Sequence, residues 1–123
     1  MHEVAAMRGV VSAVLERMRE KHATEVSRVK LVLGVSGHLT EDAARQHFAV
    51  IAAGTPAERA ELAIEWLPAT YQCFECLHRF SSIEPPNAVL CPMCGGLALE
   101  IAHSDECYAT EIDLEGVTQA ISS

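Results

Sequence analysis

The sequence predicts an α+β fold in which two helices pack on a small three-stranded sheet and a four-cysteine zinc-ribbon module is inserted before the last strand. Three observations support this prediction. Apolar residues recur at helical spacing in two segments, apolar and polar residues alternate over residues 29–35, 62–66 and 108–114, and two Cys-x-x-Cys pairs precede the last of these runs. We therefore expect one domain formed by residues 1–68 plus 104–123 and a second formed by residues 69–103.

The first helix is predicted over residues 3 to 22. Its apolar positions are three or four residues apart, which places them on one face, while charged residues take the opposite face. These apolar positions are Val4, Met7, Val11, Val14, Leu15 and Met18. The strand predicted next, over residues 29–35, ends at Gly34 and Gly37.

The second helix is predicted to begin after Thr40, whose hydroxyl can cap the free N–H groups of the first turn. Glu41 and Asp42 place negative charge at the positive end of this helix, and Gly54 marks its other end. The alternating runs at 62–66 and 108–114 supply the other two strands of the sheet. We expect the residues from Val117 onwards to fray.

The two cysteine pairs are the most specific signal in the chain. Cys73 and Cys76 form the first pair, Cys91 and Cys94 form the second, and fourteen residues separate the pairs. This spacing brings four sulfurs to one tetrahedral Zn²⁺. A disulfide framework would suit a secreted chain, but residues 1–20 lack the pattern of a signal peptide. A thioredoxin-like redox site needs one such pair between a strand and a helix, whereas the second pair here runs into two glycines, as in a metal knuckle.

The predicted zinc site is structural. Four thiolates fill a tetrahedron and leave no position for water or substrate, which argues against catalysis at this metal. The module of residues 69–103 is too short to bury a core of its own, so it must draw much of its stability from the metal.

Composition narrows the remaining functions. The chain of 123 residues has a net charge of -8, and the module of residues 69–103 has one basic residue, Arg79, against three glutamates, which argues against nucleic-acid binding. The sequence has no apolar run long enough to cross a bilayer. Together with the missing signal peptide, this predicts a cytoplasmic protein. A Ser/His/Asp set and a glycine-rich phosphate loop are also lacking, so we do not expect an enzyme.

These features together resemble the HypA/HybF hydrogenase maturation family. The chain begins Met1-His2-Glu3, continues as an amphipathic helix, and forms a strand ending near Gly34. Cys-x-x-Cys, fourteen residues and Cys-x-x-Cys then follow Glu65 and Pro68. The resemblance covers nearly the whole chain, and it rests on the combination of the amino-terminal tripeptide with the zinc motif.

The resemblance implies a nickel metallochaperone. Such a protein would bind Ni²⁺ as cargo at Met1, His2 and Glu3, hold a structural Zn²⁺, and deliver the nickel to the apo large subunit of [NiFe]-hydrogenase. In some organisms it would also serve urease. The implied partners are the hydrogenase large subunit, a nickel-handling maturation GTPase and, for urease, an accessory protein.

Coordination chemistry is compatible with nickel at the amino terminus. A terminal amine beside His2 can supply the amine, a ring nitrogen and backbone amides to one planar ion, and nitrogen-rich tetragonal sets select Ni²⁺ or Cu²⁺. The first N–H groups of a helix have no intrahelical acceptor, so those of His2 and Glu3 are free to lose a proton to the metal. Because His2 is bulky, we expect Met1 to be retained.

Several residues have a simpler interpretation beside the functional one. Met-His-Glu without its context is typical of a frayed terminus. Glu41 and Asp42 could assist nickel, but they also suit a helix start. His78 could orient or replace a thiolate or titrate near neutral pH, and Cys107 fits a small buried residue better than a nucleophile. A zinc-stabilised interaction or regulatory module without cargo metal is the alternative function, and nickel dialysis separates the two.

Overall fold

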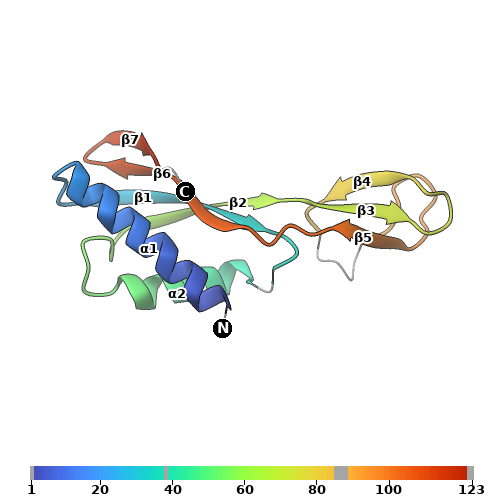
Figure 1. The fold of residues 1–123 in the computed structure, drawn as a ribbon, viewed down its shortest axis with the longest axis horizontal. Helices are drawn as coiled ribbons and strands as arrows, with labels where there is room; N and C mark the ends of the chain where they lie inside the picture. Colours follow the sequence, from blue (N-terminus) through green and yellow to red (C-terminus); the bar gives the residue numbers. More distant parts are fainter. Residues whose placement is uncertain (1, 38, 85–88, 122–123) are drawn as a thin grey trace. The chain divides into compact units, whose positions relative to one another are not determined.

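The computed structural model describes residues 2–37, 39–84 and 89–121 (Figure 1). Two helices and seven strands are formed within these residues. In chain order they are α1 (His2–Glu20), β1 (Val26–Gly34), α2 (Glu41–Ala52), β2 (Glu61–Leu67), β3 (Ala69–Cys73), β4 (Arg79–Ser82), β5 (Ala98–Ala102), β6 (Cys107–Leu114) and β7 (Val117–Ala120). Neither helix combines the length and apolar character that a bilayer span needs.

The chain divides into two compact units. The first contains the residues up to Val32, then Leu39–Glu65, and those from Cys107 onwards. The second contains a short stretch that begins at Leu33 together with Trp66–Glu106. The four cysteines of the zinc motif therefore belong to the second unit, and both helices belong to the first.

In the first unit, α1 packs against β6 and α2, and the sheet has the strand order β2-β1-β6-β7 (Figure 1). The helical spacing of apolar residues in α1 buries Met7 and Val14 completely, and Leu31 of β1 and Ile112 of β6 are buried to the same degree. Thr40 caps α2 as predicted, because its side-chain oxygen accepts a hydrogen bond of 3.1 Å from the Ala43 N–H. The α+β fold class is confirmed.

The sheet has four strands, so the prediction of three strands with a frayed end was wrong. Residues Val117–Ala120 form β7 and pair antiparallel with β6. The connection is the two-residue turn Glu115-Gly116, in which both residues have positive φ, 50° and 86°. Such a turn matches the twist of the two strands it joins, and it holds the end of the chain on the sheet.

The second unit is a three-stranded antiparallel sheet with the order β4-β3-β5. Its core is small and centres on Ala69, Tyr71 and Val89. The partly buried residues packed against this cluster are Val35, Phe80 and Ala98. So small a core stabilises a fold only weakly, as expected for a module that depends on a metal.

Candidate metal centre

The sulfur atoms of Cys73, Cys76, Cys91 and Cys94 converge at the end of the three-stranded sheet. All four lie within 4.8 Å of one another. The sulfurs of Cys73 and Cys94 are 3.4 Å apart, and those of Cys76 and Cys91 are 3.6 Å apart. The two cysteine pairs thus face each other across one centre, with Cys73 and Cys91 buried and the other two exposed.

Two loops of the same shape present these sulfurs. In the first, the N–H of Leu77 donates to the carbonyl of Cys73 at 3.2 Å, and in the second the N–H of Gly95 donates to the carbonyl of Cys91 at 2.8 Å. A hydrogen bond of 2.9 Å also closes each loop at its base. The Cys73 N–H donates to the carbonyl of His78 in the first loop, and the Cys91 N–H donates to the carbonyl of Gly96 in the second. The cluster therefore has an approximate twofold symmetry.

The fourth residue after the first cysteine of each loop has a left-handed backbone. This residue is Leu77 in the first loop, with φ of 63°, and Gly95 in the second, with φ of 76°. Glycine adopts this conformation freely, whereas a leucine is strained in it by about 1 kcal/mol. The first loop therefore stores strain that the second avoids.

Backbone hydrogen bonds and burial give the thiols unequal acidity. The N–H groups of Cys76 and Glu75 donate to the Cys73 sulfur, and despite burial they lower the pKa of Cys73 to about 6. The N–H of Gly96 lowers the pKa of Cys94, but the nearby Cys73 sulfur and burial outweigh it and raise that pKa to about 12. The thiol of Cys73 thus ionises before that of Cys94, and a cation among the sulfurs would favour ionisation of the cluster.

The cluster fits a tetrahedral, thiolate-preferring metal. Zinc–sulfur bonds of about 2.3 Å in a regular tetrahedron place the sulfurs about 3.8 Å apart. The two separations of 3.4 and 3.6 Å come close to that value. The N–H groups of Glu75 and Met93 donate to the first sulfur of each pair, which stabilises thiolate charge. Four sulfur ligands leave no open coordination position.

His78 lies next to this cluster, and its ring is directed elsewhere. The ring stacks on that of Phe80, with centroids 5.9 Å apart and planes 14° apart. Among the described residues, the group able to hold one metal consists of the four cysteines. The backbone N–H of His78 lowers the pKa of Cys76, but burial and neighbouring sulfurs leave that pKa raised. This residue acts on the cluster through its backbone.

The predicted nickel residues fall at the edge of what the structure describes. Met1 lies outside the described residues, and so do the side chains of His2 and Glu3. The backbone of α1 begins at His2, one residue earlier than predicted. The first N–H groups of the helix include those of His2 and Glu3, which are the amides considered for metal binding.

Other candidates have structural partners. Glu41 pairs with Arg45 one turn later at 3.4 Å, and both Glu41 and Asp42 lie in the first turn of α2, as their helix-start interpretation requires. Cys107 is half-buried, and this burial raises its pKa, so it is a poor nucleophile at neutral pH.

Sequence reasoning missed a polar cluster in the second unit. The Ser36 hydroxyl donates to Glu100 at 2.8 Å and accepts from the Ser104 N–H at 2.9 Å, while His103 pairs with the other oxygen of Glu100. Burial, and then the charge of Glu100, raise the pKa of Tyr71. Sixty-four residues separate Ser36 from Glu100, so no local pattern could have revealed the contact.

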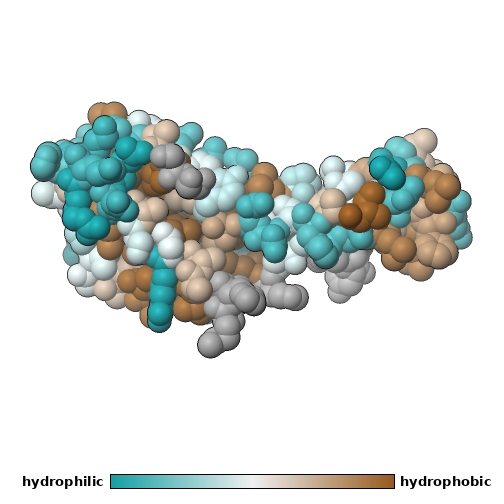
Figure 2. Space-filling model, in the orientation of Figure 1, coloured by the Kyte–Doolittle hydropathy of each residue, from teal (hydrophilic) through white to brown (hydrophobic). Residues whose placement is uncertain are grey.

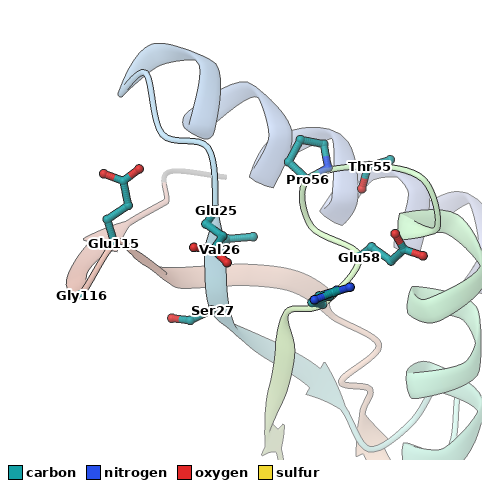
Figure 3. Close-up of a pocket in the computed structure, with 9 residues that line it drawn as sticks. Glu25, Val26, Ser27, Thr55, Pro56, Glu58, Glu115 and Gly116 are labelled. Carbon is teal, nitrogen blue, oxygen red and sulfur yellow. The ribbon is translucent and has the colours of Figure 1, made fainter.

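An open cavity of about 460 Å³ lies in the first unit (Figure 3). Its lining includes the carboxylates of Glu25, Glu58 and Glu115 and the guanidinium of Arg59. Glu115 accepts a bond of 3.3 Å from the Thr24 N–H. The carboxylates of this lining, all in the described part of the chain, do not form a group close enough to hold one metal ion, unlike the four cysteines.

Comparison with known proteins identifies a family. The sequence profile described as "Hydrogenase/urease nickel incorporation, metallochaperone, hypA" matches residues 1–114. The chain is 34% identical over 115 residues to the hydrogenase maturation factor HypA of Desulfitobacterium hafniense, covering 94% of this chain and 99% of that protein. It is 35% identical over 115 residues to HypA of Chlorobium limicola, covering 94% and 97%. A solution structure of a HypA protein shares the fold, with a TM-score of 0.60 at 18% identity and coverage of 95% of this chain and 98% of that one.

Proposed function

The chain belongs to the HypA family of nickel-incorporation metallochaperones, and from this membership we propose that it binds Ni²⁺ at its amino terminus and delivers it during hydrogenase maturation. The family match over residues 1–114 carries the proposal. A metallochaperone transfers a metal and does not catalyse a reaction, so its site needs ligands that exchange readily.

The nickel ligands in this proposal come from Met1, His2 and Glu3. The terminal amine, the imidazole of His2 and deprotonated amides form a nitrogen-rich planar set, which favours Ni²⁺. The start of α1 at His2 supports this set, because the first N–H groups of a helix have no acceptor within the helix. Loss of amide protons on binding makes the affinity fall as the pH is lowered.

The Cys73, Cys76, Cys91 and Cys94 cluster holds a structural Zn²⁺ in this proposal. Four sulfurs at tetrahedral spacing and the small core of the surrounding sheet support it. Accordingly, residues 1–68 plus 104–123 serve as the nickel-binding domain, and residues 69–103 serve as the zinc-ribbon domain. The metal of the second domain stays bound while nickel comes and goes at the first.

The recipient of the nickel in this proposal is the apo large subunit of [NiFe]-hydrogenase and, in organisms that have it, urease. A nickel-handling GTPase and a urease accessory protein complete the set of partners. The family description names both enzymes, which supports this range. We place the protein in the cytoplasm, where a reducing environment keeps its thiols available for metal.

Equilibrium dialysis of the untagged protein with Ni²⁺ tests the cargo site. We expect His2→Ala to abolish nickel binding and leave the zinc content unchanged. His47→Ala is the matched control, since it removes a half-buried histidine from α2, and it should bind nickel like the wild type. If nickel displaced zinc one for one and His2→Ala bound normally, the cargo site would lie at the cysteines. A wild-type protein that bound zinc alone would favour the interaction module without cargo.

A Gly-Ser extension before Met1 tests the amine itself. The extension separates the amine from His2, so the absorbance band of planar, diamagnetic Ni²⁺ should disappear while the helical circular dichroism remains. The same spectrum and affinity after extension would remove the amine from the ligand set. A side-chain site of His2 with Glu3, or with Glu41 and Asp42, would then replace it.

A further inference from the structure

The second unit exposes an unusual amount of apolar side chain. Ten large apolar residues are exposed among the described parts of the chain, and eight of them belong to this unit. In the space-filling view, apolar surface is conspicuous on the part of the molecule formed by β3, β4 and β5 (Figure 2). A soluble protein retains such exposure over a small unit when the surface has a partner.

Strand pairing gathers four of these side chains on one face. Gln72 lies opposite Leu99 and Cys73 opposite Ala98, so the next pair is Phe74 with Leu97, and the Phe74 N–H donates to the Leu97 carbonyl at 2.9 Å. Side chains two residues apart in a strand share a face, which puts Leu97 and Leu99 together.

Leu90 extends the same face because it forms an antiparallel bridge with Leu97. Directly opposite residues have their Cβ atoms about 5 Å apart, so this pair is also in contact range. Phe74, Leu90, Leu97 and Leu99 are 71%, 57%, 72% and 55% exposed, and we call these four residues the apolar face.

The apolar face is not the face on which the unit packs its core. Ala69, Tyr71 and Cys73 on the opposite side of β3 are buried, and Ala98 of β5 packs against them. The unit would therefore fold with polar residues in place of Leu97 and Leu99. Four such side chains expose on the order of 400 Å² together, the size at which an apolar patch marks an interaction site.

Charge restricts what can cover this face. The second unit has five acidic residues against one basic residue, Arg79. Two copies meeting through this unit would bring together two surfaces of net negative charge, which repel each other. Nucleic acid and anionic lipid are disfavoured for the same reason. The complementary surface is a protein with an apolar hollow surrounded by lysine and arginine.

We propose that the apolar face of the second unit is the docking surface for a partner protein that combines an apolar hollow with a basic rim. The proposal rests on the proposed function, since nickel delivery requires a complex with another maturation protein. The apolar contact supplies affinity, and the net negative charge of the second unit steers the encounter.

The test compares two double variants. Leu97→Thr with Leu99→Thr removes the centre of the apolar face and keeps residues that favour strands. Val50→Thr with Val117→Thr is the matched control, because it removes two exposed apolar side chains, 76% and 57% exposed, from the first unit. Both variants should match the wild type in zinc content, circular dichroism and nickel dialysis, which separates a docking failure from a failure of the nickel site.

Isothermal titration calorimetry then measures binding to the purified hydrogenase large-subunit precursor and to the nickel-handling GTPase. We expect the Leu97/Leu99 variant to bind at least one of them about tenfold more weakly or worse, and the control to bind within about twofold of the wild type. Binding of the wild type should weaken as salt is raised.

Three results would overturn the proposal. One is equal binding by the wild type and the Leu97/Leu99 variant, and another is a wild type that binds neither partner. The third is a wild-type dimer in analytical ultracentrifugation that the Leu97/Leu99 variant converts to monomer, because the face would then belong to a second copy of this chain.

Discussion

Gly34→Ala is a severe perturbation at a position with no room for a side chain. A Cβ atom built on Gly34 would lie 2.1 Å from the carbonyl oxygen of Ser104, 2.3 Å from its carbonyl carbon and 2.7 Å from the Asp105 nitrogen. All three atoms belong to the backbone, so no rotation of a side chain can relieve the overlap. The end of β1 and the segment before β6 must move apart by more than 1 Å to restore an ordinary contact of about 3.4 Å.

The magnitude follows from the hydrogen bonds that join these segments. The Gly34 N–H donates to the backbone carbonyl of Glu106, and the Ser36 N–H donates to the backbone carbonyl of Ser104, both at 2.8 Å. Separation weakens both bonds, at about 1 kcal/mol each, and adds overpacking strain of about 1 to 3 kcal/mol. We therefore expect Gly34→Ala to reduce the free energy of unfolding by about 3 to 5 kcal/mol, a large part of the total of about 5 to 15 kcal/mol for a domain.

Urea unfolding of the zinc-loaded protein, followed by the fluorescence of the single tryptophan, Trp66, measures this loss. Gly9→Ala is the matched control, because Gly9 lies inside α1 and a Cβ there would meet nothing within 4 Å. That change should raise stability by about 0.5 to 1 kcal/mol, since alanine favours a helix. If Gly34→Ala unfolded within 0.5 kcal/mol of the wild type, close packing against Ser104 would not be the reason for a glycine at this position.

Three further predictions concern the metal centre and a helix start. Cys73→Ala or Cys94→Ala should lose the metal and unfold the second unit while the helical circular dichroism persists, and a purified variant with one full equivalent of zinc would contradict this. Leu77→Gly should raise the free energy of unfolding by about 0.5 to 1 kcal/mol by relieving left-handed strain, and Gly95→Ala should lower it by about 1 kcal/mol. If urea unfolding showed that Leu77→Gly and Gly95→Ala change the free energy of unfolding in the same direction, the two loops would not be equivalent. Thr40→Ala should lower the same free energy by about 1 kcal/mol, and no loss would mean that water replaces the cap.

The parts of the fold that the sequence predicted are those with local causes. The apolar spacing of α1, the cap at Thr40 and the sulfur cluster each depend on residues close together in sequence or on one well-defined spacing. The helix α1 spans His2–Glu20 and not the predicted residues 3 to 22, and a left-handed His22 follows its last turn.

The fourth strand was missed because its turn has a weak signal. Two-residue hairpin turns with positive φ at both positions favour Asn-Gly or Asp-Gly, whereas this chain uses Glu115-Gly116. A glutamate seldom adopts such a backbone, so the sequence does not suggest it. Pairing with β6 over four residues, from Glu111 to Leu114, holds the turn in place.

Alternation alone also cannot tell which face of a strand is covered. Leu97, Leu99 and Ile101 alternate with Ala98 and Glu100, and such a pattern normally turns its large apolar side chains toward a core. The structure does the reverse, because the small Ala98 packs against the core of the second unit while Leu97 and Leu99 face outwards. The register of β5 against β3 decides this, because Ala98 lies opposite the buried Cys73 while Leu99 lies opposite the outward-facing Gln72. The large residues of β5 therefore contribute little to folding, and their exposure is best explained by a contact with another protein.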